Sequence, residues 1–190
     1  MPSPSGVVAS AATRRRAGSH TAIPTDRVPP TSLRLADLLR ITDEVAADVL
    51  DGHYADIVPS PLPAAERWSL RVRQDEEVDV WLISWVLDRS TELHDHAGSL
   101  GALTVVRGAL EESRWTGTEL KTRRLAAGDQ AAFPLGWVHD VTAASGDELP
   151  ALSVHAYSPP LTAMSYYRVL PDGRIGRTRS ELTEEPEAVR

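Results

Sequence analysis

The chain has no cysteine among its 190 residues. This absence excludes disulfides, thiolate metal sites and cysteine nucleophiles, and folding therefore does not depend on an oxidising compartment. Lysine occurs once, at Lys121, so arginine carries nearly all of the positive charge. No apolar run approaches the roughly 20 residues of a membrane helix, which excludes a membrane-spanning protein.

The balance of charge is acidic, with a formal net charge of -7 and a sequence pI of about 5.3. An acidic chain without a strong basic stripe is a poor nucleic-acid binder. Apolar residues make up 42% of the sequence, enough for one domain with a sizeable core. We therefore expect a cytoplasmic protein that binds neither nucleic acid nor membrane, as a monomer or weak homo-oligomer.

Residues 1–30 differ in composition from the rest, being rich in Ser, Ala and Pro with the basic run Arg14–Arg16. The scarcity of large apolar side chains predicts a disordered tail. A secretory signal would need an apolar segment after the basic residues, but Ala17–His20 follows them. A transit peptide stays open as an alternative.

Residues 32–51 carry apolar side chains at three- and four-residue steps, which predicts helix. Ser32 and Thr42 are suitable N-caps, so we expect two short helices that form an N-terminal cap. Residues 31–178 are expected to form one domain, and the Glu-rich residues 179–190 a solvated tail.

Short apolar stretches separated by turn residues begin at Trp68 and predict many short strands, typical of an all-β sandwich or barrel. The predicted strands are Trp68–Arg73, Val78–Trp85, Ala102–Val106, Leu110–Trp115, Leu120–Leu125, Gln130–Phe133, Trp137–Thr142, Leu152–Tyr157 and Met164–Val169.

His94 and His96 flank Asp95 in a stretch with a strand-like pattern. Side chains two residues apart on a strand point to one face, whereas on a helix they diverge by about 200°. Both imidazoles can therefore converge on one ion, and neutral imidazole suits iron, zinc, copper and nickel. A solvated polar strand end is the alternative interpretation.

A second stretch runs from Gly128 through Pro134 and Gly136 to His139, with the spacing G-x5-P-x-G-x2-H. Glycine and proline at such offsets mark tight corners that direct the next strand inward. This stretch, and the earlier one that starts at the paired histidines and ends at Gly108, resemble the two motifs of the cupin superfamily. The resemblance implies a mainly β protein, a cupin or small jelly-roll β-barrel with an internal metal.

Three positions depart from the cupin pattern. Asp88 stands where a glycine is usual, Ala143 replaces a final asparagine, and Gly101 stands where most cupins place a glutamate ligand. Without that glutamate the ligands are three neutral histidines, which leave the full charge of a dication for anions from outside the protein. Iron oxygenases more often use two histidines and one carboxylate. The three-histidine set favours a substrate that brings its own anion, such as a thiolate.

Ser153, His155 and Tyr157 alternate along a predicted strand, so their side chains share one face. A hydroxyl, an imidazole and a phenol in a row can hydrogen-bond serially, and the imidazole would orient the phenol and tune its proton. Apolar residues occupy the positions between them, so alternation leaves open which face points inward.

The HDH, PxGxxH and S-x-H-x-Y-S-P-P motifs together resemble the cysteine dioxygenase family of thiol dioxygenases, over about Trp68–Pro160. The resemblance implies Fe(II) held by three histidines: His94, His96 and His139. It implies a hydrogen-bonded catalytic triad with its phenol near substrate and oxygen: Ser153, His155 and Tyr157. Mammalian members carry a cysteine at the Gly101 position, cross-linked to the tyrosine. This chain has none, so Tyr157 is expected to be unmodified, as in bacterial members.

The resemblance also implies that an arginine of an early strand binds the substrate carboxylate, which a planar guanidinium suits. The candidates are Arg67, Arg71 and Arg73, and counting back through the hairpin from Trp85 favours Arg71. A surface arginine paired with a hairpin acid remains the alternative for each. Trp85 itself is expected in the core rather than as a cavity wall.

From these motifs we expect an Fe(II)-dependent dioxygenase of cysteine catabolism, which converts L-cysteine and O2 to cysteine sulfinate. Its partners would be a small-molecule thiol and O2. Two alternatives stay open: a dioxygenase of another small thiol, 3-mercaptopropionate or cysteamine, and a cupin that binds a metal such as zinc without oxidising a substrate.

Overall fold

The computed structural model describes residues 33–146 and 150–186. Within these residues the chain forms one helix, α1 (Leu35–Leu50), and eleven strands. The strands are β1 (Ser69–Gln74), β2 (Asp79–Trp85), β3 (His94–Asp95), β4 (Leu100–Arg107), β5 (Ala109–Trp115), β6 (Leu120–Ala126), β7 (Gln130–Phe133), β8 (His139–Ala143), β9 (Ala151–Ser158), β10 (Ala163–Val169) and β11 (Ile175–Leu182).

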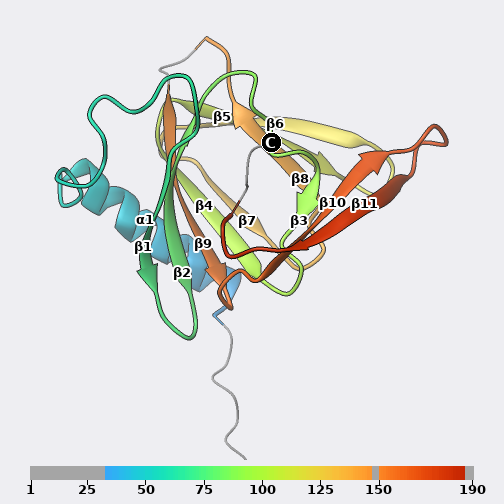
Figure 1. Cartoon of the computed structure of the whole chain (residues 1–190), viewed down its shortest axis with the longest axis horizontal. Helices are drawn as coiled ribbons and strands as arrows, with labels where there is room; N and C mark the ends of the chain where they lie inside the picture. The colour runs from blue at the N-terminus through green and yellow to red at the C-terminus, as the bar shows by residue number, and fades with distance from the viewer. Residues whose placement is uncertain (1–32, 147–149, 187–190) are drawn as a thin grey trace, which may run out of the picture.

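The strands form two sheets, and every pairing between them is antiparallel. One sheet has the order β1-β2-β9-β4-β7, and the other has the order β11-β10-β3-β8-β5-β6. Their inner faces enclose a core to which both sheets contribute, while α1 lies along the outer face of the five-stranded sheet (Figure 1). The predicted mainly β fold is confirmed.

Strand β2 contributes to two hydrophobic clusters, one inside the barrel and one beneath α1. All seven of its residues are buried. Trp81, Ile83 and Trp85 point into the barrel, whereas Val80 and Leu82 point toward the helix. This follows from the two-residue period of a strand, with one face between the sheets and the other beneath α1. The functional side chains described below occupy the inner face.

The N-terminal cap is one continuous helix rather than the two that were predicted. Thr42 was expected to cap a second helix, but it lies within α1 and is fully buried. Its hydroxyl donates to the Leu39 carbonyl at 3.0 Å and accepts from the Thr104 hydroxyl at 2.8 Å. Because β4 supplies a partner for the threonine, the helix passes through it without a break. Residues 1–30 and Ser32 lie outside the described residues.

The C-terminal region also differs from the prediction. Strand β11 pairs with β10 along its length and continues to Leu182, past the predicted start of a solvated tail at residue 179. It is an edge strand with mostly exposed or half-buried residues, so it lacks the apolar alternation that predicts strands. Its order comes from the hydrogen bonds of the hairpin, which extends from one end of the barrel (Figure 1).

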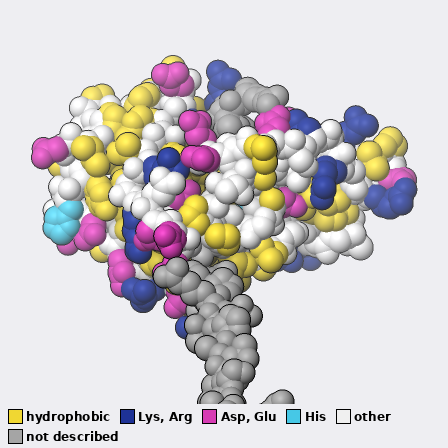
Figure 2. Space-filling model, turned by 60° about the horizontal axis from the view of Figure 1, so that its bottom comes forward, with side chains coloured by type: hydrophobic (Ala, Val, Ile, Leu, Met, Phe, Trp, Pro, Cys, Tyr) yellow, Lys and Arg dark blue, Asp and Glu magenta, His cyan; other side chains and the backbone are white. Residues whose placement is uncertain are grey.

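Among the described residues no helix has the length and apolar character needed to cross a membrane. On the face drawn in Figure 2, basic and acidic side chains are interspersed rather than gathered by sign. Histidine is visible at one edge of this face, whereas His94, His96, His139 and His155 are buried.

Candidate metal centre and active site

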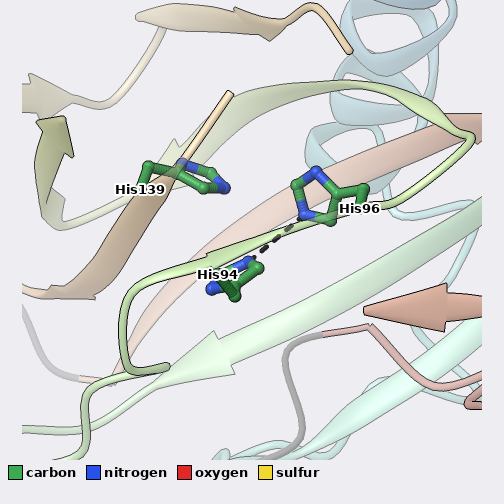
Figure 3. Close-up of side chains that lie close together, drawn as sticks. All are labelled: His94, His96 and His139. Carbon is green, nitrogen blue, oxygen red and sulfur yellow. Dashed lines mark hydrogen bonds between the residues drawn. The ribbon is translucent and has the colours of Figure 1, made fainter. Parts of the chain in front are cut away.

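Three histidines in or next to two paired strands, β3 and β8, meet inside the barrel. His94 begins β3, His96 follows that strand directly, and His139 begins β8, where it pairs with His94. One ring nitrogen from each residue lies within 4.8 Å of the others, and all three side chains are buried. The rings point toward one another in Figure 3. These histidines can hold one metal ion.

Hydrogen bonds at the outer ring nitrogens set which nitrogen of each ligand faces inward. His94 Nδ1 lies 2.9 Å from the Glu92 carbonyl, and His139 Nδ1 lies 3.1 Å from Glu112 Oε1. Because a carbonyl and a carboxylate only accept, both Nδ1 atoms carry the proton and both Nε2 atoms keep a lone pair. The Nε2 atom of His139 is buried and has no hydrogen-bond partner within residues 33–146 and 150–186. A metal ion fits such a nitrogen.

The close approach of the first two ligands supports the same conclusion. His94 Nε2 and His96 Nε2 are 3.3 Å apart (Figure 3). Since His94 Nε2 is an acceptor, His96 Nε2 either donates its proton to it or shares a cation with it. Three imidazole nitrogens in a buried site form a donor set suited to iron, zinc, copper or nickel.

Glu112 is a functional candidate that the motif analysis missed. Its side chain is fully buried, and it accepts hydrogen bonds from His139 Nδ1, from Trp137 Nε1 at 2.9 Å and from Arg123. Burial alone would raise its pKa, but His139, Trp137 and Arg123 together lower the pKa of Glu112 to about 2. It is therefore an anion that fixes the tautomer and direction of one ligand.

The sequence predicted a metal site made only of neutral side chains, whereas the structure adds the carboxylate of Glu112. The expected ligands are still three imidazoles, but one negative charge lies directly behind His139. Glu112 shares the inward face of Leu110 on β5, so its place in the alternation was a usable signal. A glutamate at a core position of a strand is rare unless it is paired.

The HDH segment is supported from outside by the hairpin of β10 and β11. Glu92 has a φ of 60° and Ala97 a φ of 50°, so left-handed residues bracket the motif on both sides. The Glu92 carboxylate pairs with Arg179, whose guanidinium lies 3.6 Å from the ring centroid of Tyr166. Tyr166 in turn packs against His94, with ring centroids 6.2 Å apart.

Asp95, the middle residue of the motif, points away from the metal ligands. It accepts a hydrogen bond from the Tyr167 hydroxyl at 2.7 Å and from the Ala97 backbone N–H at 3.0 Å. These contacts hold the turn that directly follows His96. Asp95 is thus a structural support rather than a ligand.

Ser153, His155 and Tyr157 lie on β9 and point into the barrel, which answers the question that alternation left open. The Tyr157 hydroxyl lies 3.1 Å from His155 Nδ1, and His155 Nε2 lies 2.9 Å from Ser153 Oγ. Trp85 Nε1 donates to Ser153 Oγ at 2.8 Å and so extends the series. The Tyr157 and His96 ring centroids are 4.9 Å apart, which brings the phenol next to the candidate metal ligands.

Trp85 is fully buried in the barrel core, as the sequence predicted, and it also supplies this hydrogen bond. An indole N–H only donates, so Ser153 Oγ must accept from it. The serine hydrogen is then available to His155 Nε2, and His155 Nδ1–H is available to the Tyr157 oxygen. The series can therefore carry a proton order in which Ser153 donates to His155 and His155 donates to Tyr157.

Gly101 leaves the room that the phenol ring occupies. A Cβ at this position would lie 3.3 Å from two carbons of the Tyr157 ring and 2.9 Å from the Phe133 ring. Both rings also pack on metal-site histidines, Tyr157 on His96 and Phe133 on His139. The missing glutamate of the cupin pattern is thus replaced by aromatic surface.

The three candidate arginines differ in the side chains that they contact. Arg73 pairs with Asp75 in the hairpin at 2.8 Å and is half-exposed. Arg71 lies over the Trp81 ring with its guanidinium 5.0 Å from the centroid, and it pairs with Glu184 at 3.8 Å. Arg67 lies 4.0 Å over the ring of Trp85.

The tryptophans under these two arginines place them at different points along the triad. Trp81 is the strand neighbour of His155. Trp85 bonds to Ser153, at the end of the series away from Tyr157. Arg71 is therefore nearer than Arg67 to the tyrosine end, and Arg73 belongs to the hairpin surface.

Comparison with known proteins agrees with this geometry. The family described as cysteine dioxygenase type I matches residues 65–169, which span the histidine cluster and the Ser153–Tyr157 series. A search of curated proteins finds no match.

The chain is also similar to solved structures at low sequence identity. KdgF from Halomonas sp. is 21% identical over 51% of this chain and 85% of that chain, with a TM-score of 0.44. A double-stranded β-helix protein from Klebsiella pneumoniae is 19% identical over 62% and 89%, with a TM-score of 0.44. A cupin superfamily protein from Desulfitobacterium hafniense is 15% identical over 50% and 80%, with a TM-score of 0.42. Since the family match covers more than half of its residues, the chain belongs to the cysteine dioxygenase type I family.

Proposed function

We propose that this protein is an Fe(II)-dependent thiol dioxygenase of the cytoplasm that converts L-cysteine and O2 to cysteine sulfinate, as a step of cysteine catabolism. The observation that carries the proposal is the triad on β9, whose phenol lies against one histidine of a buried three-histidine cluster. A cupin that only bound a metal would not need that series. Both atoms of O2 would be transferred to the sulfur, so that the thiol is oxidised to a sulfinate and no other reductant is required.

His94, His96 and His139 would hold the ferrous ion through their Nε2 atoms. A bound ferrous ion would supply the one-electron chemistry by which O2 reacts with a thiolate sulfur. The protein's part is to position the substrate, exclude water and control one proton. Its ligands are all buried, and the aromatic rings of Phe133 and Tyr157 cover them on the side of the five-stranded sheet.

Tyr157 would control the proton. In the proton order that we assign to the series, Ser153 donates to His155 Nε2 and His155 Nδ1–H donates to the Tyr157 oxygen. The phenol hydrogen is then directed away from His155, toward the space where the substrate would lie. A phenol with a fixed donor behind it can give this proton to developing negative charge and recover it afterwards.

Arg71 would bind the substrate carboxylate. It stands on the inner side of β1, over Trp81, and its guanidinium remains 28% exposed. Its present partner is Glu184, a carboxylate at 3.8 Å whose own side chain is 74% exposed. A substrate carboxylate could replace that loose contact with a bidentate pair.

Oxygen uptake by the iron-loaded protein tests the proposal directly. We expect uptake with L-cysteine and a sulfinate product identified by mass. The same assay with 3-mercaptopropionate and cysteamine tests the other thiols. A zinc-containing protein that, after iron loading, consumes no oxygen with any of the three thiols would instead be a metal-binding cupin without oxidase activity.

A further inference from the structure

Asp79 is a buried carboxylate on the inner wall of the barrel that the proposed reaction does not yet use. It begins β2, shares the inner face of Trp81 and Trp85, and is fully buried. In the sheet it is the direct neighbour of Tyr157, which in turn neighbours Gly101. Adjacent strands lie about 4.8 Å apart, so the side chains of Asp79 and Tyr157 are neighbours on the inner face of the sheet.

The contacts of this carboxylate leave one oxygen unsatisfied. Its Oδ2 atom accepts from Trp81 Nε1 at 3.0 Å, but its Oδ1 atom is buried and has no hydrogen-bond partner among the described residues. Burial raises the pKa of Asp79, and the hydrogen bond from the Trp81 N–H is the largest effect that opposes the rise. A buried acceptor without a donor is costly, so such an atom points to a ligand or a functional role.

Asp79 and Arg71 form a pair of opposite charges around one indole. Arg71 lies over the face of the Trp81 ring, and Asp79 accepts from the N–H of the same ring. The arginine is partly exposed, whereas the carboxylate is fully buried, so the two lie at different depths of the wall. A cation and an anion so arranged match the carboxylate and the amine of an α-amino acid.

We propose that Asp79 Oδ1 accepts a hydrogen bond from the substrate amine and makes the protein selective for aminothiols over thiols that lack an amine. This inference rests on the proposed function, since it assigns the amine of the same thiol substrate. An amine keeps N–H donors whether it is a free ammonium or is coordinated to a metal. A thiol with hydrogen in place of the amine would leave the buried oxygen unpaired, and sites built for a hydrogen bond reject such analogues.

The test measures the binding of three thiols to cobalt-loaded protein in the absence of oxygen. The thiolate-to-cobalt absorption band reports the binding. L-Cysteine and cysteamine carry an amine, and 3-mercaptopropionate does not. Asp79→Asn should weaken binding of both aminothiols by about tenfold or more, as expected for a lost hydrogen bond to a charged group. Binding of 3-mercaptopropionate should be unchanged or tighter.

The melting temperatures of the variants show whether Asp79 binds the substrate amine or only stabilises the fold. Because Asp79→Asn removes a buried charge with an unpaired oxygen, its melting temperature should equal or exceed that of the wild type. Asp79→Ser, which is smaller, should show the same selective loss. Asp75→Asn is the matched control, since that carboxylate belongs to the same hairpin but faces solvent and pairs with Arg73. It should bind all three thiols like the wild type.

The outcomes are distinguishable. If the wild type binds thiols and neither Asp79 variant changes the ratio between aminothiols and 3-mercaptopropionate, the role of Asp79 is wrong while the proposed function stands. An equal loss of all three thiols has the same meaning. If the wild type binds none of the thiols and consumes no oxygen with them, the proposed function fails and the inference fails with it.

Discussion

The two sheets of the barrel contribute different chemistry to the same interior. The six-stranded sheet carries the candidate metal ligands His94 and His139, and behind them the buried carboxylate of Glu112. The five-stranded sheet carries the Ser153–His155–Tyr157 series, with Asp79 and Arg71 on neighbouring strands. Metal affinity should therefore depend on one sheet, and proton control and substrate selection on the other.

The difference also lies in how each sheet fixes its polar groups. In the six-stranded sheet, the outer nitrogens of His94 and His139 face acceptors, which leaves their inner nitrogens as lone pairs for a cation. In the five-stranded sheet, the indole donors of Trp85 and Trp81 hold Ser153 and Asp79. One wall thus presents acceptors that suit a metal, and the other presents the hydrogen-bonding groups to which we assign the substrate. Substitutions on each wall can break or sharpen this contrast.

The largest effect is expected on the six-stranded sheet. His139→Ala removes one of three ligands and should abolish iron retention, because two imidazoles hold iron far more weakly than three. Iron content after gel filtration measures the loss. His53→Ala, at an exposed histidine, is the control and should keep its iron. Full iron content and full turnover in the His139 variant would show that the ligand set is wrong.

Tyr157→Phe should have the next largest effect, and on turnover only. The variant keeps the ring that packs on His96 but loses the hydroxyl that His155 holds. We expect normal iron content and a kcat reduced by about 100-fold or more, the usual scale of a lost proton-transfer group. Steady-state oxygen uptake with matched iron analysis provides the measurement. A loss of iron here would contradict the division of labour between the sheets.

Glu112→Gln should weaken metal binding by about 10- to 100-fold, as substitutions behind a histidine ligand commonly do. Glutamine keeps an oxygen for His139 Nδ1 but removes the negative charge. Competition with a chelator measures the affinity. If affinity is unchanged while kcat falls, Glu112 would belong functionally with the triad instead.

The same carboxylate gives the metal-free fold a pH dependence. The pKa of Glu112 is lowered from 4.5 to about 2 in the folded protein. The ionised carboxylate therefore stabilises the fold fully at pH values above 4.5, the pKa in the unfolded chain. This stabilisation is lost as the pH falls toward 2, the pKa in the folded protein. The difference in unfolding free energy between wild type and Glu112→Gln should stay constant down to about pH 4.5 and shrink toward pH 2. Denaturant titrations across this range check the sign, and a difference that grows in acid would contradict it.

The smallest effect concerns the substrate carboxylate. Arg71→Ala should raise KM for L-cysteine about tenfold with little change in iron content, because a charged hydrogen-bonded pair is lost. Arg73→Ala, two residues along the same strand, should leave KM unchanged, since Arg73 pairs with Asp75 outside the barrel. Arg67→Ala tests whether Arg67, the remaining candidate, binds the substrate carboxylate instead of Arg71. A larger KM effect from Arg67 than from Arg71 would move the anchor toward Trp85 and Ser153.

The clustering of the three histidines and of the Ser153–His155–Tyr157 series could be predicted because short motifs carry these residues; their roles stay predictions. His94 and His96 are two residues apart, and the corner residues Pro134 and Gly136 fix the entry of His139. Strand alternation placed the triad on one face, and the structure adds that this face points inward. The nine predicted strands lie within two residues of observed ones. Strand β11 was missed because its exposed edge lacks the apolar alternation that predicts a strand.

Other features depend on partners distant in the sequence and could not be predicted in the same way. Glu112 acquires its role because β5 pairs with β8 and sets it beside His139. Asp79 stood out only when its neighbour across the sheet was known to be Tyr157. Thr42 continues its helix because Thr104 meets it. In each case tertiary pairing decides the outcome, and local propensity does not contain it.

Labelled oxygen tests the central claim most directly. Iron-loaded protein is supplied with L-cysteine under ¹⁸O2, and the mass of the product is measured by mass spectrometry. The account predicts cysteine sulfinate that carries label at both sulfinate oxygens, at a rate that iron removal abolishes and iron return restores. A product that contains solvent oxygen, or oxidation to cystine alone, would contradict it.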